Sequence, residues 1–267
     1  MRAFAAVSLS LLFIAFVVLF FFPSDTDRFF AWTIRPTMTA MLMGAGYLAA
    51  TYFFLRLLRE RQWHRVALAF PAIVAFSSCM TVATALHWDR FNHEHPAFWV
   101  WAVGYAVAPF LVVALWLVNR RGDPGVPEAG DVAVPPAFRG LLAVGGVGAI
   151  AFALALIVAP GTMIAIWPWQ LTPLTARVLG GWFAVPAFIA LAIAIDRRWS
   201  AARYLVQSQI VGLALVLVAF ARAWAELDQG PGTWASIVGV MVVLGFNVEL
   251  YWRMERQQRT TQEVSPA

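Results

Sequence analysis

Long apolar segments alternate with short polar stretches along nearly the whole chain. Each apolar segment holds about 20 residues, which is the length of helix that crosses a hydrocarbon layer of about 30 Å. Inside lipid, a helix satisfies every backbone polar group within its own segment. The pattern therefore predicts an all-α, polytopic membrane protein with eight transmembrane helices. The predicted spans are approximately 3–22, 38–58, 65–87, 97–118, 138–160, 175–195, 201–223 and 234–252.

Composition and charge agree with a lipid environment. Of the 267 residues, 61% are hydrophobic and 12% are charged, whereas a soluble domain carries roughly 25% charged residues. The net charge of +5 comes from arginine alone, since the chain contains no lysine. The arginines flank the apolar segments and do not gather with aromatic residues on one face, so we expect membrane lipids and no nucleic acid as partners.

The distribution of arginine predicts the orientation. If the N-terminus is cytoplasmic, 14 of the 19 arginines fall in segments on the inner side. Because positive charge is retained on the cytoplasmic side, this count predicts a multi-pass membrane protein with both termini cytoplasmic.

The sequence also matches itself at an offset of 136 residues. This offset aligns VATALHW (82–88) with VAFARAW (218–224), and ERQW (60–63) with DRRW (196–199). One further residue of shift aligns Trp32 with Trp169. Such a match predicts an internal repeat, and four spans per copy give two parallel four-helix repeats related by a pseudo-two-fold axis along the membrane normal. The predicted divisions are a first repeat at 1–118, a flexible cytoplasmic linker at 119–137, a second repeat at 138–255 and a disordered cytoplasmic tail at 256–267.

The segment LHWDRFNHEHPAFWVW (86–101) contains three of the chain's four histidines. In one interpretation His87, His93 and His95 bind a transition metal, or His87 binds haem between neighbouring tryptophans. In the other, they are ordinary polar residues of a loop at the membrane interface. The segment has no cysteine and matches no common zinc spacing, which favours the interfacial loop. The sequence identifies no cofactor.

Arg177 is the second candidate, because it lies inside the outer end of the sixth span. A charge at this depth is a site hypothesis by default. With Arg90, it predicts a ligand pocket in an outward-facing groove between the repeats. The other residues expected at the rim of this groove are Trp32, Trp88, Trp167 and Trp169. The alternative is an ion pair between Arg177 and Glu226, which lowers the cost of the charge without a ligand.

A third group of candidates lies deeper in the membrane. Gln207 is inside the seventh span, and Pro71, Pro109 and Pro186 interrupt the third, fourth and sixth. Kinks beside polar side chains suit a cavity, but they suit close helix packing equally well. The chain has no nucleophile motif, phosphate-binding loop or dinucleotide turn, and no lysine for a Schiff base, which favours a protein that is not an enzyme.

The motifs FAWTIRPTMTAMLMGAGY (30–47) and LHWDRF (86–91) resemble uncharacterised multi-spanning membrane proteins of actinobacteria-type genomes. The resemblance covers most of the chain. It implies a bacterial plasma-membrane location and assigns no functional residue.

The function expected from these features is transport or binding of a small molecule or lipid at a groove between the two repeats. One alternative is a redox protein that binds haem or a metal at the outer histidines. The other is a non-catalytic accessory subunit that docks a small-residue face, such as residues 145–148, on a partner.

Overall fold

The computed structural model describes residues 1–264 and confirms an all-α, polytopic architecture. Within these residues eight helical spans are long and apolar enough to cross a membrane. The spans are α1 (Arg2–Phe21), α3 (Thr37–Arg59), α4 (His64–Ala67) with α5 (Phe70–Leu86), α6 (Pro96–Asn119), α7 (Pro136–Val158), α9 (Pro173–Ile195), α10 (Trp199–Arg222) and α11 (Pro231–Val264). Short helices occupy the connections: η1 (Pro23–Asp25), α2 (Thr26–Phe29), η2 (Trp88–Arg90), η3 (Arg120–Gly122), α8 (Pro160–Ile166) and η4 (Trp224–Glu226).

Proline marks the beginning of several spans. Helices α6, α7, α9 and α11 each start at a proline, where the missing N–H costs nothing because the first turn has no acceptor for it. Pro71 is at the second residue of α5, directly after the break that separates α4 from α5. Pro109 and Pro186 lie inside continuous helices, α6 and α9.

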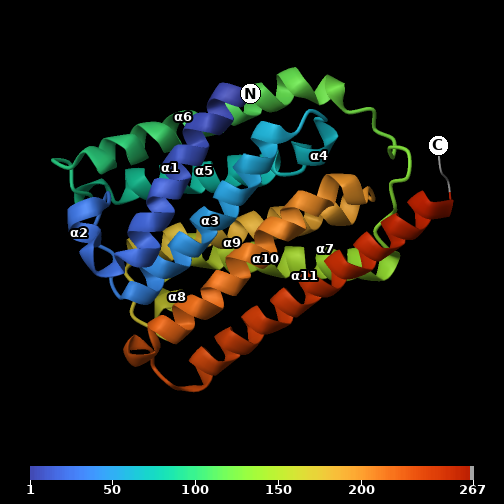
Figure 1. Cartoon of the computed structure of the whole chain (residues 1–267). Helices are drawn as coiled ribbons and strands as arrows, with labels where there is room; N and C mark the ends of the chain where they lie inside the picture. Colours follow the sequence, from blue (N-terminus) through green and yellow to red (C-terminus); the bar gives the residue numbers. More distant parts are fainter. Residues whose placement is uncertain (265–267) are drawn as a thin grey trace.

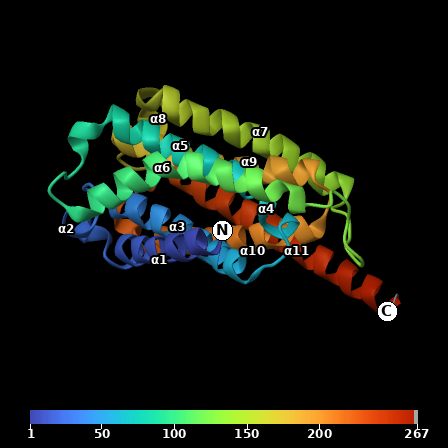
Figure 2. The ribbon, with the colours of Figure 1, turned by 90° about the horizontal axis from the view of Figure 1, so that it is seen from above.

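The spans form two layers of four helices (Figures 1 and 2). In the first layer α1 packs on α3, α3 on α10, and α10 on α11. In the second layer α6 packs on α5, α5 on α9, and α9 on α7. Contacts of α3 with α9 and of α4 with α10 join the layers.

Each layer contains helices from both halves of the chain, residues 1–118 and 138–255. Helices α1 and α3 of the first half pack beside α10 and α11 of the second, while α5 and α6 lie in the other layer with α7 and α9. The spatial units therefore differ from the predicted sequence divisions. The halves interleave because the buried faces of α3 and α5 are both covered by helices of the second half.

Equivalent positions of the two halves make similar contacts. The Asn92 N–H donates to the Ala31 carbonyl (2.9 Å), and the Asp228 N–H donates to the Pro168 carbonyl (3.3 Å). The segments ERQW (60–63) and DRRW (196–199) each begin with a carboxylate. Glu60 and Asp196 each accept a hydrogen bond from the backbone N–H two residues further along the chain, at 3.0 Å.

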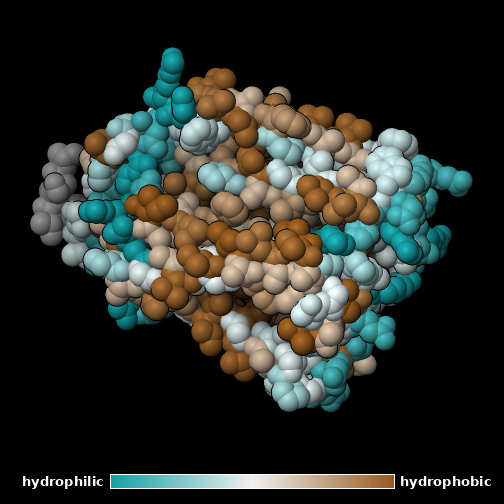
Figure 3. All heavy atoms as spheres, turned by 180° about the vertical axis from the view of Figure 1, so that it is seen from behind, coloured by the Kyte–Doolittle hydropathy of each residue, from teal (hydrophilic) through white to brown (hydrophobic). Residues whose placement is uncertain are grey.

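The outer surface suits lipid. Large hydrophobic side chains are exposed along the spans, including Phe110, Val144 and Val242. Figure 3 shows hydrophobic side chains over the middle of one face, with hydrophilic side chains gathered at its two ends. In water, a hydrophobic surface of this extent would drive association.

The linker is held against the bundle, in contrast to the predicted flexible segment. Asp123 accepts two bonds from the Arg198 guanidinium, at 2.6 and 2.9 Å, and Asp131 accepts from the Ser200 N–H and hydroxyl. An isolated bridge between Ala133 and Arg198 adds backbone pairing. The Arg198 guanidinium lowers the pKa of Asp123 below its ordinary value, so this carboxyl is anionic. The linker and the end of α11 lie at one end of the bundle, which we call the linker end, and α2 and α8 lie at the opposite end, which we call the outer end (Figures 1 and 2).

The C-terminal segment also differs from the prediction. Helix α11 continues to Val264, so residues 256–264 are helical where the sequence predicts a disordered tail. The rest of that predicted tail, residues 265–267, lies outside the described residues.

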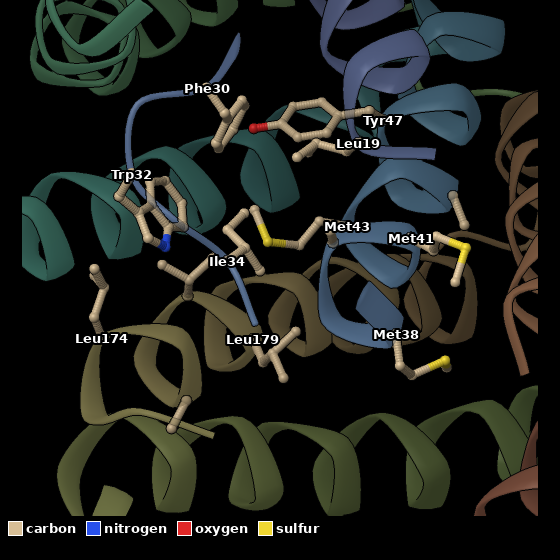
Figure 4. Packing of buried hydrophobic residues seen from close by; sticks show 14 of the residues in the cluster. Leu19, Phe30, Trp32, Ile34, Met38, Met41, Met43, Tyr47, Leu174 and Leu179 are labelled. Carbon is tan, nitrogen blue, oxygen red and sulfur yellow. The ribbon is translucent and has the colours of Figure 1, made fainter. Parts of the chain in front are cut away.

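A glycine allows α3 and α9 to cross closely. A Cβ on Gly46 would collide with the indole ring of Trp182, which is the residue at the equivalent position of the second half. The indole packs on Tyr47 and Phe76, with ring centroids 4.9 and 4.5 Å apart. Around this crossing, apolar side chains of α3 and α9, including Met43, Tyr47 and Leu179, form the core (Figure 4).

We predict that Gly46→Ala lowers stability. The added methyl must displace Trp182, and overpacking of this kind costs about 1–3 kcal/mol. Thermal unfolding in detergent, followed by tryptophan fluorescence, measures the change. Gly148→Ala is the matched control, because a Cβ at Gly148 meets nothing within 4 Å. Equal melting temperatures for the two variants would contradict the tight α3–α9 crossing.

Candidate functional site

The structure places the predicted outer tryptophans in different environments. Trp32, which is labelled in Figure 4, is 3% exposed and packs edge-on against Phe91 and Trp101. Trp169 is also buried, and its Nε1 donates to Thr39 Oγ1 across the two halves (2.8 Å). Trp167 is half-buried against Trp169, whereas Trp88 is exposed. Trp32 and Trp169 are therefore core residues at the outer end of the bundle.

Arg177 joins the two halves at the outer end. Its Nη1 donates to His87 Nε2 (2.7 Å), and its Nε donates to the Ile157 carbonyl in the last turn of α7 (3.1 Å). A cation at a helix C-terminus is stabilised by the unpaired carbonyls there. The guanidinium is therefore satisfied by α7 and by the residue that follows α5.

The predicted Arg177–Glu226 pair does not form, and Arg90 lies in a different environment from Arg177. Glu226 accepts from the Thr37 N–H (2.7 Å) and hydroxyl (2.8 Å), where it caps the N-terminus of α3. Arg90 pairs with Asp89 (3.2 Å) in an exposed position. The reason lies in packing: α3 presents free N–H groups to Glu226, and Arg177 finds a neutral imidazole nearer than any carboxylate.

The three outer histidines have separate partners. His87 accepts from Arg177, His93 packs between the rings of Trp88 and Phe98, and His95 Nδ1 accepts from the Ala97 N–H at the start of α6 (3.1 Å). Among residues 1–261, whose side chains the structure describes, no group of three His, Cys, Asp or Glu is placed to hold a metal ion. The three rings thus serve separately, in a hydrogen bond to Arg177, in aromatic packing and in capping of α6.

A cluster of polar side chains lies near the opposite end of the bundle, where α3, α10 and α11 meet. We call Tyr52, Arg56, Tyr204, Gln207 and Tyr251 the tyrosine cluster. Gln207 accepts from the Tyr52 hydroxyl (2.6 Å) and donates to the Tyr251 hydroxyl (2.9 Å), which ties the three helices together. Arg56 Nε donates to the Tyr52 hydroxyl (3.0 Å), and its guanidinium lies 4.9 Å from the centre of the Tyr204 ring.

The tyrosine cluster is confined to one layer. At the offset of 136 residues, every member of the cluster corresponds to an apolar residue in the other half. The counterparts are Phe188, Ala192, Leu68, Pro71 and Leu115. The scaffold thus folds without these polar groups at the equivalent place, so their presence here points to a role beyond folding.

Charged groups continue the cluster toward the linker. The Tyr204 hydroxyl donates to Glu60 Oε2 (2.9 Å), and Arg65 bonds Glu60 and the linker residue Glu128. Burial acts to raise the pKa of Glu60, but hydrogen bonds from the Gln62 N–H, the Tyr204 hydroxyl and the Arg61 N–H outweigh it and lower the pKa. Glu60 is therefore an anionic acceptor at the edge of the cluster.

A cavity of about 40 Å³ opens beside Tyr204 at the boundary between the two halves. Its lining residues come from α4, the linker, α10 and α11: Arg65, Glu128, Ser200, Arg203, Tyr204 and Gln258. A water needs roughly 10–15 Å³ by this measure, so the cavity has room for a few waters or one carboxylate- or phosphate-sized group. A wider, open cavity of about 510 Å³ lies between residues 132–133 of the linker and α11.

The sequence prediction included one member of this site, Gln207, and none of its tyrosines. All five tyrosines of the chain correspond to residues without a hydroxyl in the other half. A comparison of the halves for polar residues found in only one of them would have found the cluster.

The chain matches no family model, no curated protein and no solved structure. Inference about function therefore starts from the contacts described above.

We predict that His87 makes stability depend on pH. Burial and the nearby Arg177 charge lower the pKa of His87 below its ordinary value of 6.5. Protonation therefore favours the unfolded chain, so this stabilisation is complete above pH 6.5 and is lost as the pH falls through the lowered pKa. The melting temperature of the wild type should fall more between about pH 7.5 and about pH 5.5 than that of His87→Gln, whose side chain still accepts from Arg177 without titrating. Parallel pH profiles for the two proteins would show that the imidazole does not act in this way.

Proposed function

We propose that the protein binds or transports a small molecule or lipid at a site between the two halves of the chain, at its linker end. The observation that carries the proposal is the tyrosine cluster. Each of its polar residues corresponds to an apolar residue in the opposite half of the chain. The adjoining cavity is lined by both halves and the linker, so a ligand there contacts both layers and the segment that connects the halves.

Arg56 supports a ligand over simple packing. Its guanidinium lies in the last turn of the α3 span, and it has no carboxylate of residues 1–261 within 4.0 Å. Its partners are the Tyr52 hydroxyl, Gln207 and aromatic rings. Charges inside membrane spans are costly and usually serve a function, and a structural role would be met by an apolar residue such as Ala192, its counterpart.

We predict that the purified protein retains a bound adduct that depends on the cluster. Native mass spectrometry from a mild detergent should show the adduct on the wild type. Arg56→Gln should reduce its occupancy by roughly tenfold or more, since a hydrogen bond to a charged group contributes about 1.5–3 kcal/mol. Arg121→Gln, which removes an exposed charge at the same end, is the control and should retain the adduct. Identical spectra for all three proteins would refute a ligand site at the cluster.

We further propose that the chain is an internal duplication in a bacterial cytoplasmic membrane, with both termini and the linker on the cytoplasmic side. The recurring helix pairs and backbone hydrogen bonds at equivalent positions support the duplication. The excess of arginine in the segments at the linker end supports the orientation.

Cysteine labelling tests this orientation. Cys79 is the chain's one cysteine, so Cys79→Ser provides a background for single exposed cysteines at Val126 in the linker and at Glu94 in the outer loop. In intact cells, a membrane-impermeant maleimide should label Glu94→Cys and leave Val126→Cys unlabelled until the membrane is permeabilised. The reverse labelling would invert the proposed orientation.

A non-catalytic assembly subunit is the second candidate function. The observation that favours it is the open face of α7, where a Cβ on Gly145 or Gly148 would meet nothing within 4 Å. Such a surface allows another helix to approach closely.

A further inference from the structure

We infer that the linker-end cavity recognises a phosphate group and that Glu128 of the linker occupies part of the same site as an internal anion. This inference rests on the proposed function, and it adds the chemical class of the ligand and a means of regulation. It depends on the distribution of donors around the cavity and on how the linker is attached.

The two arginines that line the cavity differ in how many of their N–H groups have hydrogen-bond partners. Arg65 donates through Nε and Nη2 to Glu128, at 3.2 and 2.8 Å, and through Nη1 to Glu60, at 3.4 Å. Arg203 donates through Nη2 to Glu255 (2.6 Å), whereas its Nε is buried and has no hydrogen-bond partner among the described residues. The Arg203 side chain is 39% exposed and lines the cavity, so its remaining N–H groups can donate to an anion that enters there.

The shape of the cavity restricts the ligand. Its volume of about 40 Å³ admits one compact polar group, not a sugar or a nucleobase. A guanidinium presents several N–H groups in a plane, which matches the oxygens of phosphate. The cavity also lies at the polar end of α10, where lipid headgroups meet the protein, so the phosphate can belong to a lipid or be free in solution.

Glu128 supplies an anion to the same cavity when no ligand is bound. Its carboxylate holds Arg65, and Oε2 lies 3.7 Å from His64 Nε2. The His64 ring is buried, and its Nε2 has no hydrogen-bond partner among the described residues. A phosphate that enters the cavity competes with Glu128 for Arg65. Ligand binding and docking of the linker are consequently coupled.

The experiment measures binding to the full-length protein in detergent. Four probes are compared: phosphatidic acid, phosphatidylcholine and diacylglycerol in mixed micelles, and sodium phosphate without lipid. We expect phosphatidic acid to bind at least about tenfold more tightly than diacylglycerol, which has the same chains and no phosphate. Phosphatidylcholine should bind less tightly than phosphatidic acid because its choline neutralises the phosphate. If sodium phosphate binds as tightly as phosphatidic acid, the phosphate recognised is the soluble ion; weaker binding assigns it to a lipid headgroup.

Three variants test the residues. Arg203→Gln should abolish the preference for phosphatidic acid over diacylglycerol. Glu128→Gln should tighten phosphatidic acid binding severalfold because it removes the competing anion, and it should leave diacylglycerol binding unchanged. Arg259→Gln, an exposed charge on α11 next to Gln258, controls for general surface attraction and should behave as the wild type.

The outcomes separate this inference from the proposed function. Phosphate recognition would be overturned if phosphatidic acid and diacylglycerol bind equally and sodium phosphate does not bind. It would also be overturned if Arg203→Gln and Arg259→Gln lose equal amounts of phosphatidic acid binding. If Arg203→Gln fails to fold, the Glu128→Gln variant decides. Unchanged binding of phosphatidic acid to Glu128→Gln would overturn the proposed competition between Glu128 and phosphate. If the wild type carries the adduct but does not recognise phosphate, the ligand belongs to another class and the proposed site stands. If the wild type carries no adduct either, both the proposed site and phosphate recognition are refuted.

Discussion

In a hydrocarbon layer no water is present to bond an unpaired N–H or C=O group, and the whole structure depends on this constraint. Each span therefore forms nearly all of its backbone bonds within itself, and irregular backbone lies in the connections and at the break between α4 and α5. Because lipid chains are as apolar as the side chains of the spans, burial alone does not hold the helices together. Close contacts such as Gly46 against Trp182, and polar bonds such as Trp169 to Thr39, must position them instead.

The same constraint explains the interleaving of the two halves. Within the first half, α1 and α3 pack as one pair and α5 and α6 as another, and each pair is completed by a pair from the second half. Every layer is thus a joint product of both halves. At the outer end Arg177 bonds His87 across the halves, and at the opposite end Glu128 and Asp123 of the linker bond Arg65 and Arg198. Both ends are therefore held by charges that have specific partners.

The two halves differ in the large and polar side chains that they place within the bundle. The crossing of Gly46 and Trp182 places the smallest and the largest side chain at equivalent positions, so the two layers cannot be identical around it. Tyr47 next to this crossing bonds Tyr105 in the other layer (3.0 Å). The tyrosine cluster then extends this asymmetry toward the linker, and the cavity lies at its end.

The eight spans, their approximate ends and the membrane class follow from the sequence itself, because a lipid-spanning helix needs a local run of about 20 apolar residues and little else. Partners in space were decided only by the tertiary structure. Arg177 was recognised as a buried charge, yet its imidazole partner lies 90 residues away in the chain, and Glu226 was engaged by the N-terminus of α3 instead. Trp32 and Trp169 were predicted at the membrane interface because tryptophan is common there, but they lie in the core. The sequence pattern does not distinguish a side chain that faces lipid from one that faces another helix. The tyrosine cluster escaped prediction for the same physical reason: its five residues come from three helices, and only their packing brings the hydroxyls, the amide and the guanidinium within bonding distance.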